Sequence, residues 1–182
     1  AGGGKYFVDL GKERFDGYRE NSEHDETTVL VKLDHALGDD RSLGLSFNNH
    51  DSKSGISGPI LKTAVDQNPR QKNEYALDSD GWNNKLSLYS LNYQHGSFMT
   101  NVFSESRVQD SVMTGQWGTS DFALHSNSYG ATTQFKSGIL SLGAEYRKDE
   151  VSNPSTYGKK ELTTNTWGTF AQAELGSELL NL

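Results

Sequence analysis

Apolar and polar residues alternate in several separate segments of this chain, and this alternation limits the secondary structure that the segments can form. Apolar residues recur at every second position in these segments, and over no long window do they recur at helical spacing. Residues two apart in a strand share one face, so each segment predicts a strand with one apolar and one polar face. The clearest segments are residues 6–10, 29–33, 43–47, 140–146 and 167–175.

The segment from Lys85 to Tyr93 is the one place where the alternation changes phase. Leu86 and Leu88 lie out of step with Tyr89 and Leu91. An extra residue in a strand shifts every later side chain to the other face, so the pattern predicts a β-bulge here.

Repetition of this pattern predicts about eight strands, each of roughly ten residues or more. Strands of soluble sheets usually have five or six residues, whereas tilted membrane-spanning strands need about nine to eleven. We therefore expect an all-β fold over residues 1–182. The expected architecture is an antiparallel up-and-down β-barrel of the outer-membrane type, either partial or small and closed.

The predicted connections alternate between long and short. In an up-and-down sheet every second connection lies at the same end, so this alternation places all long loops on one side, as in outer-membrane barrels. A soluble sandwich with Greek-key crossings has no reason to sort its loops in this way. The predicted long connections are residues 16–27, 51–81, 109–120 and 149–162, and the short ones are 37–41, 95–97, 136–138 and 176–177.

The composition supports a thin sheet rather than a globular core. Hydrophobic residues make up 33% of the chain, which is below the roughly 45–50% apolar content of a typical globular domain. The mean hydropathy is -0.71. Aromatic residues reach 10%, which together with the periodicity argues against disorder.

Several classes of function are disfavoured by the residues themselves. The chain has no cysteine, which excludes disulfides and thiolate metal sites. Its net charge of -7 disfavours nucleic acid as a partner. We recognise no catalytic motif and expect no enzyme, metal site or cofactor. We also expect no signal peptide, because residues 1–4 have neither a charged nor an apolar region.

Four motifs, in this order, resemble the barrel portion of TonB-dependent outer-membrane receptors. They are residues 16–22 (DGYRENS), 54–60 (SGISGPI), 141–150 (SLGAEYRKDE) and 166–174 (TWGTFAQAE). The resemblance implies a receptor in the outer membrane of a Gram-negative bacterium that takes up a scarce ligand. Siderophore-bound iron and cobalamin, a corrinoid, are examples of such ligands.

The same resemblance implies the partners of the chain. The full receptor would contain a plug domain and would contact membrane lipid and the TonB energy-coupling protein. We recognise no plug in this chain and expect its last residues to begin a further strand. We therefore expect an internal fragment that can self-associate through exposed edge strands. Ligand contacts in such receptors include loop aromatics, and the candidates are Tyr75, Trp82 and Trp117.

Two other interpretations remain open. The chain could be a self-contained eight-stranded outer-membrane barrel with a structural or adhesive role, since eight strands is a permitted closed size. It could instead be a soluble, lipocalin-like barrel with its apolar face inside. Tyr6, Tyr146 and Trp167 would belong to an interfacial aromatic belt if the apolar face meets lipid.

Overall fold

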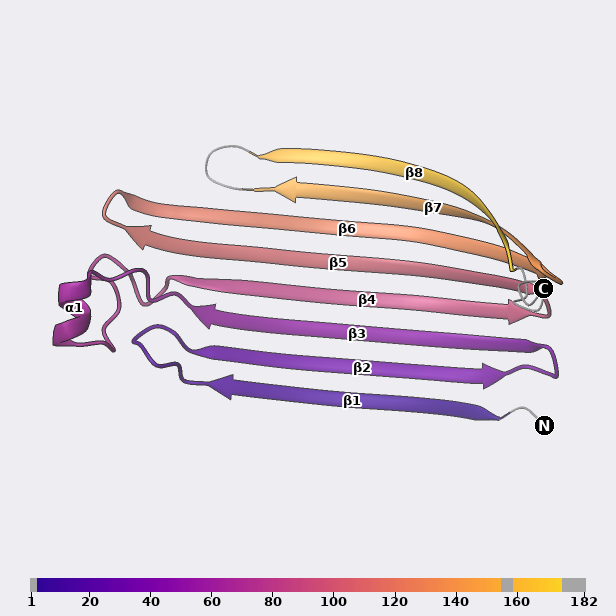
Figure 1. The fold of residues 1–182 in the computed structure, drawn as a ribbon, viewed down its shortest axis with the longest axis horizontal. Coiled ribbons are helices and arrows are strands. Elements are labelled where there is room, and N and C mark those ends of the chain that lie inside the picture. Colours follow the sequence, from indigo (N-terminus) through magenta and orange to yellow (C-terminus); the bar gives the residue numbers. More distant parts are fainter. Residues whose placement is uncertain (1–2, 155–158, 175–182) are drawn as a thin grey trace, which may run out of the picture.

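The computed structural model describes residues 3–154 and 159–174, and most of them lie in one antiparallel sheet (Figure 1). The predicted turn at residues 176–177 and the strand start after it lie outside the described residues. The strands are β1 (Gly4–Phe15), β2 (His24–Ala36), β3 (Arg41–Gly55), β4 (Gly81–His95), β5 (Phe98–Gly115), β6 (Gly118–Ser137), β7 (Leu140–Asn153) and β8 (Lys160–Ala173), and one short helix, α1 (Lys62–Gln67), lies between β3 and β4.

The strands follow one another in sheet order β1 to β8, and every neighbouring pair is antiparallel. This confirms the predicted all-β, up-and-down fold. The sheet does not close: among the described residues, β1 pairs only with β2 and β8 only with β7. Figure 1 shows the two edge strands at opposite margins of the sheet.

The predicted sorting of loops holds in part. The predicted long loop over residues 149–162 is reduced to residues 154–159, because β7 runs to Asn153 and β8 begins at Lys160. Residues 37–40, 96–97 and 138–139 make short connections at one end, and residues 16–23 and 56–80 make longer ones at the other. The predicted long loop over residues 109–120 is wrong, because β5 and β6 continue through it to a two-residue turn at Gln116–Trp117. Both strands are polar on both faces there, so their sequence resembles a loop.

The predicted bulge in β4 is also wrong. The register between β3 and β4 runs without interruption from Arg41–His95 to Gly55–Gly81, and the register with β5 is equally continuous. Leu86 and Leu88 therefore lie on the opposite face of the sheet from Tyr89 and Leu91. The change of phase in the sequence reflects apolar residues on both faces of one strand.

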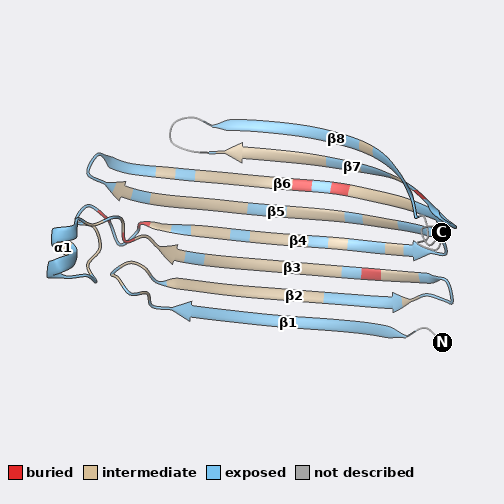
Figure 2. Ribbon diagram, viewed as in Figure 1, coloured by how far each residue is buried: buried red, intermediate tan, exposed pale blue. Residues whose placement is uncertain are grey.

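The molecule has almost no interior. Among the described residues, only Ala76 is a buried hydrophobic residue, and the sheet is a single layer with both faces reaching the surface (Figure 2). Thirty large hydrophobic side chains within residues 3–154 and 159–174 are exposed. A sheet face that buries apolar side chains normally packs against a second layer, so the medium or partner that covers this sheet is the central question about its function.

Candidate functional site

The register divides the sheet into two chemically different faces, because paired residues of neighbouring strands point to the same side. One face carries an apolar band next to the short connections. We define the apolar band as Tyr6, Val8 and Leu10 of β1, Val29, Val31 and Leu33 of β2, Leu43, Leu45 and Phe47 of β3, Tyr89, Leu91 and Tyr93 of β4, Phe98, Thr100 and Val102 of β5, Tyr129, Ala131, Thr133 and Phe135 of β6, Leu140, Leu142, Ala144 and Tyr146 of β7, and Trp167, Thr169 and Ala171 of β8.

The apolar band ends abruptly towards the long loops. On the same face, the strands continue with charged residues, several of them in ion pairs such as Lys85–Asp51 at 3.4 Å and Lys148–Glu150 at 2.6 Å. The band covers five to seven residues per strand, which at ~3.3 Å per residue is about 20 Å. This is of the same order as the roughly 25 Å apolar band of outer-membrane barrels.

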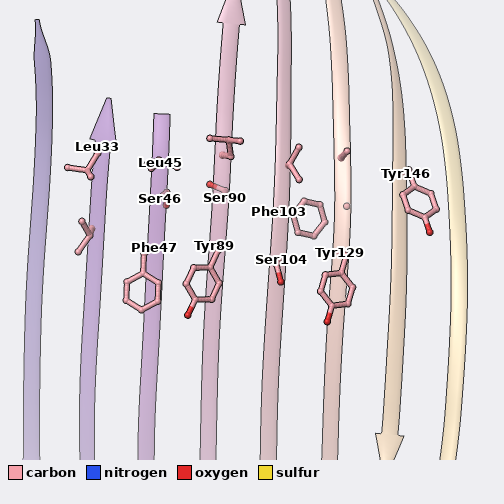
Figure 3. A pocket seen from close by; sticks show the side chains of 15 residues that line it. Leu33, Leu45, Ser46, Phe47, Tyr89, Ser90, Phe103, Ser104, Tyr129 and Tyr146 are labelled. Carbon is pink, nitrogen blue, oxygen red and sulfur yellow. The ribbon is translucent and has the colours of Figure 1, made fainter. Parts of the chain in front are cut away.

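Aromatic rings mark the border between the apolar band and the charged ends of the strands. Phe47 and Tyr89 are register partners with ring centroids 5.0 Å apart (Figure 3). Tyr146 and Trp167 are also register partners, 4.3 Å apart, and the Tyr146 hydroxyl donates a hydrogen bond to Asn165 Oδ1 at 3.1 Å. Amphipathic rings of this kind suit a boundary between hydrocarbon and water.

The opposite face is polar along the same stretch of the strands, and we call it the polar face. Arg147 anchors its largest hydrogen-bonded group: the guanidinium donates to both carboxylate oxygens of Asp149, at 2.8 and 3.0 Å, and to Ser128 Oγ at 3.2 Å. The other polar residues of this face at this level include Asp9, Lys32, Asp34, Ser46, Asn48, Ser90, Asn92, Asn101, Glu105, Arg107 and Glu145. The face also carries the apolar residues Phe7, Leu30, Leu88, Met99, Phe103 and Phe170.

Glycines on the polar face make room for large neighbouring side chains. A Cβ built on Gly130 would lie 2.4 Å from the ring of Phe103, and one on Gly143 would lie 2.2 Å from the ring of Phe170. The Arg147 guanidinium carbon in turn lies 5.8 Å from the Phe103 ring centroid. The rings of Phe103 and Phe170 therefore lie over the glycines of the neighbouring strands, close to the sheet.

At the long-loop end, the β1–β2 connection is tied to the β3–β4 connection by side chains that donate to backbone carbonyls. Asn21 adopts a positive φ of 54°, and its amide nitrogen lies 2.9–3.0 Å from the carbonyl oxygens of Ile56, Leu77 and Asp80. Arg19 donates to Gly58 O at 2.8 Å. We call this assembly of residues 16–23 and 56–80 the loop cap.

Asp80 joins the loop cap to the β5–β6 hairpin. Its side chain is 1% exposed and accepts hydrogen bonds from the Leu77 amide and from the amide and hydroxyl of Thr114. Burial by itself would raise the pKa of Asp80, but the hydrogen bonds from Thr114 and Leu77 and the charge of Lys72 outweigh it, so the pKa lies below its usual value.

The three predicted ligand-contacting aromatics do not converge on one cavity. Trp82 lies in strand β4 rather than in a loop, with its ring 6.4 Å from that of Phe122 and nearly parallel to it. Trp82 lines a hollow of about 460 Å³ beside the loop cap, together with Asp25, Asp80 and Asp110. Tyr75 and Trp117 are not among the lining residues.

Tyr75 and Trp117 occupy two different loops. Trp117 is at the tip of the β5–β6 hairpin and is 95% exposed. Tyr75 lies in the loop cap, where a hydrogen bond to the Glu74 carboxylate, and the charge of that carboxylate, raise the pKa of the Tyr75 phenol.

Sequence reasoning missed the residues that hold the loop cap together. Asn21 carries one local signal, because asparagine tolerates positive φ better than most residues. The carbonyl partners of Asn21, and Thr114 as the partner of Asp80, are more than thirty residues away, and no local pattern identifies them.

The described residues contain neither a candidate metal site nor a helix of membrane-spanning length. No group of three or more His, Cys, Asp or Glu side chains there is arranged to hold a metal ion. No helix within the described ranges has the length and apolarity needed to cross a membrane.

Comparison of the chain with protein-family models, with curated proteins and with solved structures found no match in any of the three.

Proposed function

We propose that this chain forms part of the wall of a β-barrel in the outer membrane of a Gram-negative bacterium. We further propose that the barrel takes up a small, scarce ligand, such as siderophore-bound iron or cobalamin, in the manner of TonB-dependent receptors. The observation that carries the proposal is the single-layered sheet, with the apolar band on one side and the polar face on the other.

Hydrocarbon is the medium that suits the apolar band. In water, the exposed band would be an apolar patch far larger than the few hundred Å² that monomeric soluble proteins tolerate. In a bilayer, the band would meet lipid, and the sheet ladder would satisfy the backbone polar groups of all but the edge strands, as a spanning structure requires. The aromatic border at Tyr89 and Trp167 would then lie at the headgroup level.

The distribution of burial supports the assignment of the polar face to the barrel interior. The most buried strand residues, Gly44, Ser128, Gly130 and Ser141, all lie on the polar face, whereas the large side chains of the apolar band are mostly exposed. Side chains crowd together on the inner side of a curved sheet and spread apart on its outer side.

The long-loop end supports the uptake role. The loop cap is pre-organised by hydrogen bonds, and beside it lies a hollow lined by the carboxylates of Asp25, Asp80 and Asp110. On the opposite face of the sheet, the rings of Trp82 and Phe122 stack at the same end of the strands, and large aromatic side chains are suited to metal chelates and corrinoids. In the complete receptor, the expected partners are a plug domain, the TonB energy-coupling protein and membrane lipid.

The three tryptophans test the orientation of the faces. Each double Trp→Phe variant leaves one tryptophan: Trp167 in the apolar band, Trp82 on the polar face or Trp117 at the hairpin tip. After refolding into phosphatidylcholine vesicles with brominated acyl chains, we expect strong quenching of Trp167 only. Aqueous iodide should quench Trp117 most strongly. Trp82 lies beyond the Tyr89 border towards the long loops and serves, like Trp117, as a reference outside the bilayer. Lipid quenching of Trp167 no stronger than that of Trp82 and Trp117 would contradict the proposal.

The uptake role needs a separate measurement on the same variants. Ferric hydroxamate siderophores and cobalamin are added in turn to the refolded protein. Saturable quenching of Trp82 or Trp117, with Trp167 unchanged, would support ligand capture at the loop cap. Absence of saturable quenching with both probes would contradict uptake of these ligands while leaving the membrane assignment intact.

A further inference from the structure

Two Asp-Gly dipeptides occur in the chain, and the structure gives them opposite surroundings. Asp16–Gly17 follows β1 directly, and Asp80–Gly81 joins the loop cap to β4. Aspartate isomerises most readily before glycine, because glycine has no side chain to hinder attack of its amide nitrogen on the aspartate carboxyl carbon. The reaction also requires that the carboxyl group and the amide be free of other strong contacts.

The carboxylate of Asp16 is open to solvent and held only weakly. Its side chain is 90% exposed, and Arg14 Nε, its ion-pair partner at 3.7 Å, belongs to a side chain that is 75% exposed. An ion pair as exposed as this one contributes little to holding its partners in place. Within the described residues, the Gly17 amide donates no hydrogen bond. Both reacting groups are therefore free.

The fold requires glycine at position 17. Gly17 has a φ of 78°, in the left-handed region that favours glycine. A Cβ built on Gly17 would lie 2.2 Å from Ser22 Oγ and 2.3 Å from Ser22 O. Ser22 Oγ accepts a hydrogen bond from the Arg19 amide and donates one to the Arg19 carbonyl, so Ser22 is fixed in place. The residue that makes Asp16 reactive is thus also one that the loop cap needs.

The second dipeptide has neither of these freedoms. The Asp80 side chain is buried, and both of its carboxylate oxygens accept hydrogen bonds, from Leu77 and Thr114. Gly81 is the first residue of β4 and is paired with both neighbouring strands. Attack of the Gly81 nitrogen on Asp80 would have to break these contacts, so reaction there requires local unfolding. Asp80–Gly81 is therefore an internal control for Asp16–Gly17.

We propose that Asp16 isomerises spontaneously to isoaspartate and that this modification loosens the loop cap as the protein ages. The Gly17 nitrogen attacks Asp16 Cγ, the carboxyl hydroxyl leaves as water with the amide proton, and a succinimide ring forms. Water then opens the ring at either of its carbonyl carbons. Opening at Cγ restores aspartate, whereas opening at the main-chain carbonyl carbon leaves the chain running through Cγ. The product has the same mass as aspartate, but its main chain is longer by one methylene group.

The added methylene group lies between β1 and the residues that anchor the loop cap. Arg19 and Asn21 follow in the same connection, and their side chains donate hydrogen bonds to the carbonyl oxygens of Gly58 and Asp80. A longer path from β1 displaces these donors from their acceptors, so isomerised chains should open the loop cap more often. Nothing in this chemistry depends on the medium that covers the sheet, so it can be tested separately from the proposed function.

The test follows isoaspartate at both dipeptides during incubation of the refolded protein in warm neutral buffer. Protein isoaspartyl methyltransferase labels the modified chains, and mass spectrometry locates the change in the tryptic peptides 15–19 and 73–85. We expect isoaspartate to accumulate at Asp16 at least tenfold faster than at Asp80. In urea, which removes the fold, the two sites should react at similar rates. Similar rates in the folded protein, or no isoaspartate in peptide 15–19, would overturn the assignment.

Asp16→Glu is the matched variant for the effect on the loop cap. It keeps the charge, but its longer side chain would have to close a larger ring, which forms far more slowly. Limited proteolysis within residues 56–80 should be at least threefold faster in aged than in fresh wild-type protein, and unchanged by ageing in Asp16→Glu. If aged wild-type protein contains isoaspartate but is cleaved no faster than fresh protein, the link to the loop cap is overturned. Equal acceleration in Asp16→Glu would overturn it as well.

Discussion

Asp80 and Thr114 form a two-point contact between the loop cap and the β5–β6 hairpin. One carboxylate oxygen accepts from the Thr114 amide and the other from its hydroxyl, both at 2.8 Å. Asp80 is 1% exposed, so this contact is shielded from water. Hydrogen bonds to a charged acceptor contribute about 1.5–3 kcal/mol, which makes this contact a principal support of the hairpin.

Asp80→Asn should release the hairpin from the loop cap. The amide keeps one acceptor oxygen but loses the charge and the second acceptor, so Thr114 loses one of its two hydrogen bonds. We expect hydrogen exchange at the Thr114 amide to accelerate at least tenfold. Asp78→Asn is the control: Asp78 pairs with Lys72 near the surface, and its loss should leave Thr114 unchanged. Equal acceleration in both variants would contradict the assigned role of Asp80.

Acid should loosen the same contact. The pKa of Asp80 in the folded chain lies below the ordinary value of 3.8. A carboxyl group whose pKa is lowered by folding stabilises the fold above its unfolded pKa, and this stabilisation is lost as the pH falls through the folded pKa. We therefore expect Thr114 exchange, corrected for intrinsic rates, to be flat above about pH 5 and to rise below about pH 4. A rise between pH 5 and 7 would point to a different group.

Replacing Asn21 should loosen the loop cap, and alanine should have a larger effect than glycine. Asn21→Ala removes the hydrogen bonds to the loop carbonyls and leaves a Cβ at a φ of 54°, where the left-handed region costs about 1–2 kcal/mol. Asn21→Gly relieves the backbone cost only. Limited proteolysis within residues 56–80 should therefore be fastest for alanine, intermediate for glycine and slowest for the wild type. Equal rates for alanine and glycine would show that the backbone conformation is unimportant.

Adjacent residues of β3 offer a matched test of which face meets lipid. Leu45 belongs to the apolar band and Ser46 to the polar face. In a bilayer, Leu45→Arg should lower the free energy of unfolding by about 2–4 kcal/mol, whereas Ser46→Arg should change it by less than about 1 kcal/mol. Urea titration in phosphatidylcholine vesicles measures both. A reversed order would place the polar face against lipid and refute the membrane orientation.

Gly130 should be intolerant of a side chain because Phe103 occupies its space. A Cβ at this position would also lie 2.9 Å from the backbone oxygen of Tyr146, so the sheet itself would have to shift. Gly130→Ala should cost about 1–3 kcal/mol, as overpacking does. Gly115→Ala, where nothing lies within 4 Å, should be nearly neutral. The double variant Gly130→Ala/Phe103→Ala should recover part of the loss in the same urea titration.

The order and direction of the strands followed from the sequence wherever one face is apolar and the other polar. Leu140 to Tyr146 is such a segment, and its period of two admits no other regular structure. The prediction failed over residues 109–115, where β5 is mostly polar on both faces although it pairs with β6 throughout and with β4 as far as Val112. The predicted bulge failed because Leu86 and Leu88 lie on the polar face of a regular strand.

The candidate site was less predictable than the fold because its contacts are long-range. Aromatic residues in predicted loops led to Tyr75, Trp82 and Trp117, but the strand boundary places Trp82 on the sheet. The contact between Asp80 and Thr114 joins segments that no local pattern relates.

Within the described ranges, every element-to-element contact joins strands that are consecutive in the chain. Such a sheet can form one hairpin at a time, since no strand pairing requires a strand from a distant part of the chain to arrive first. It also has no obligatory size, because each added strand leaves an equivalent margin ready for the next. The number of strands in such a sheet is therefore set by the length of the polypeptide and by the partners of its two edge strands.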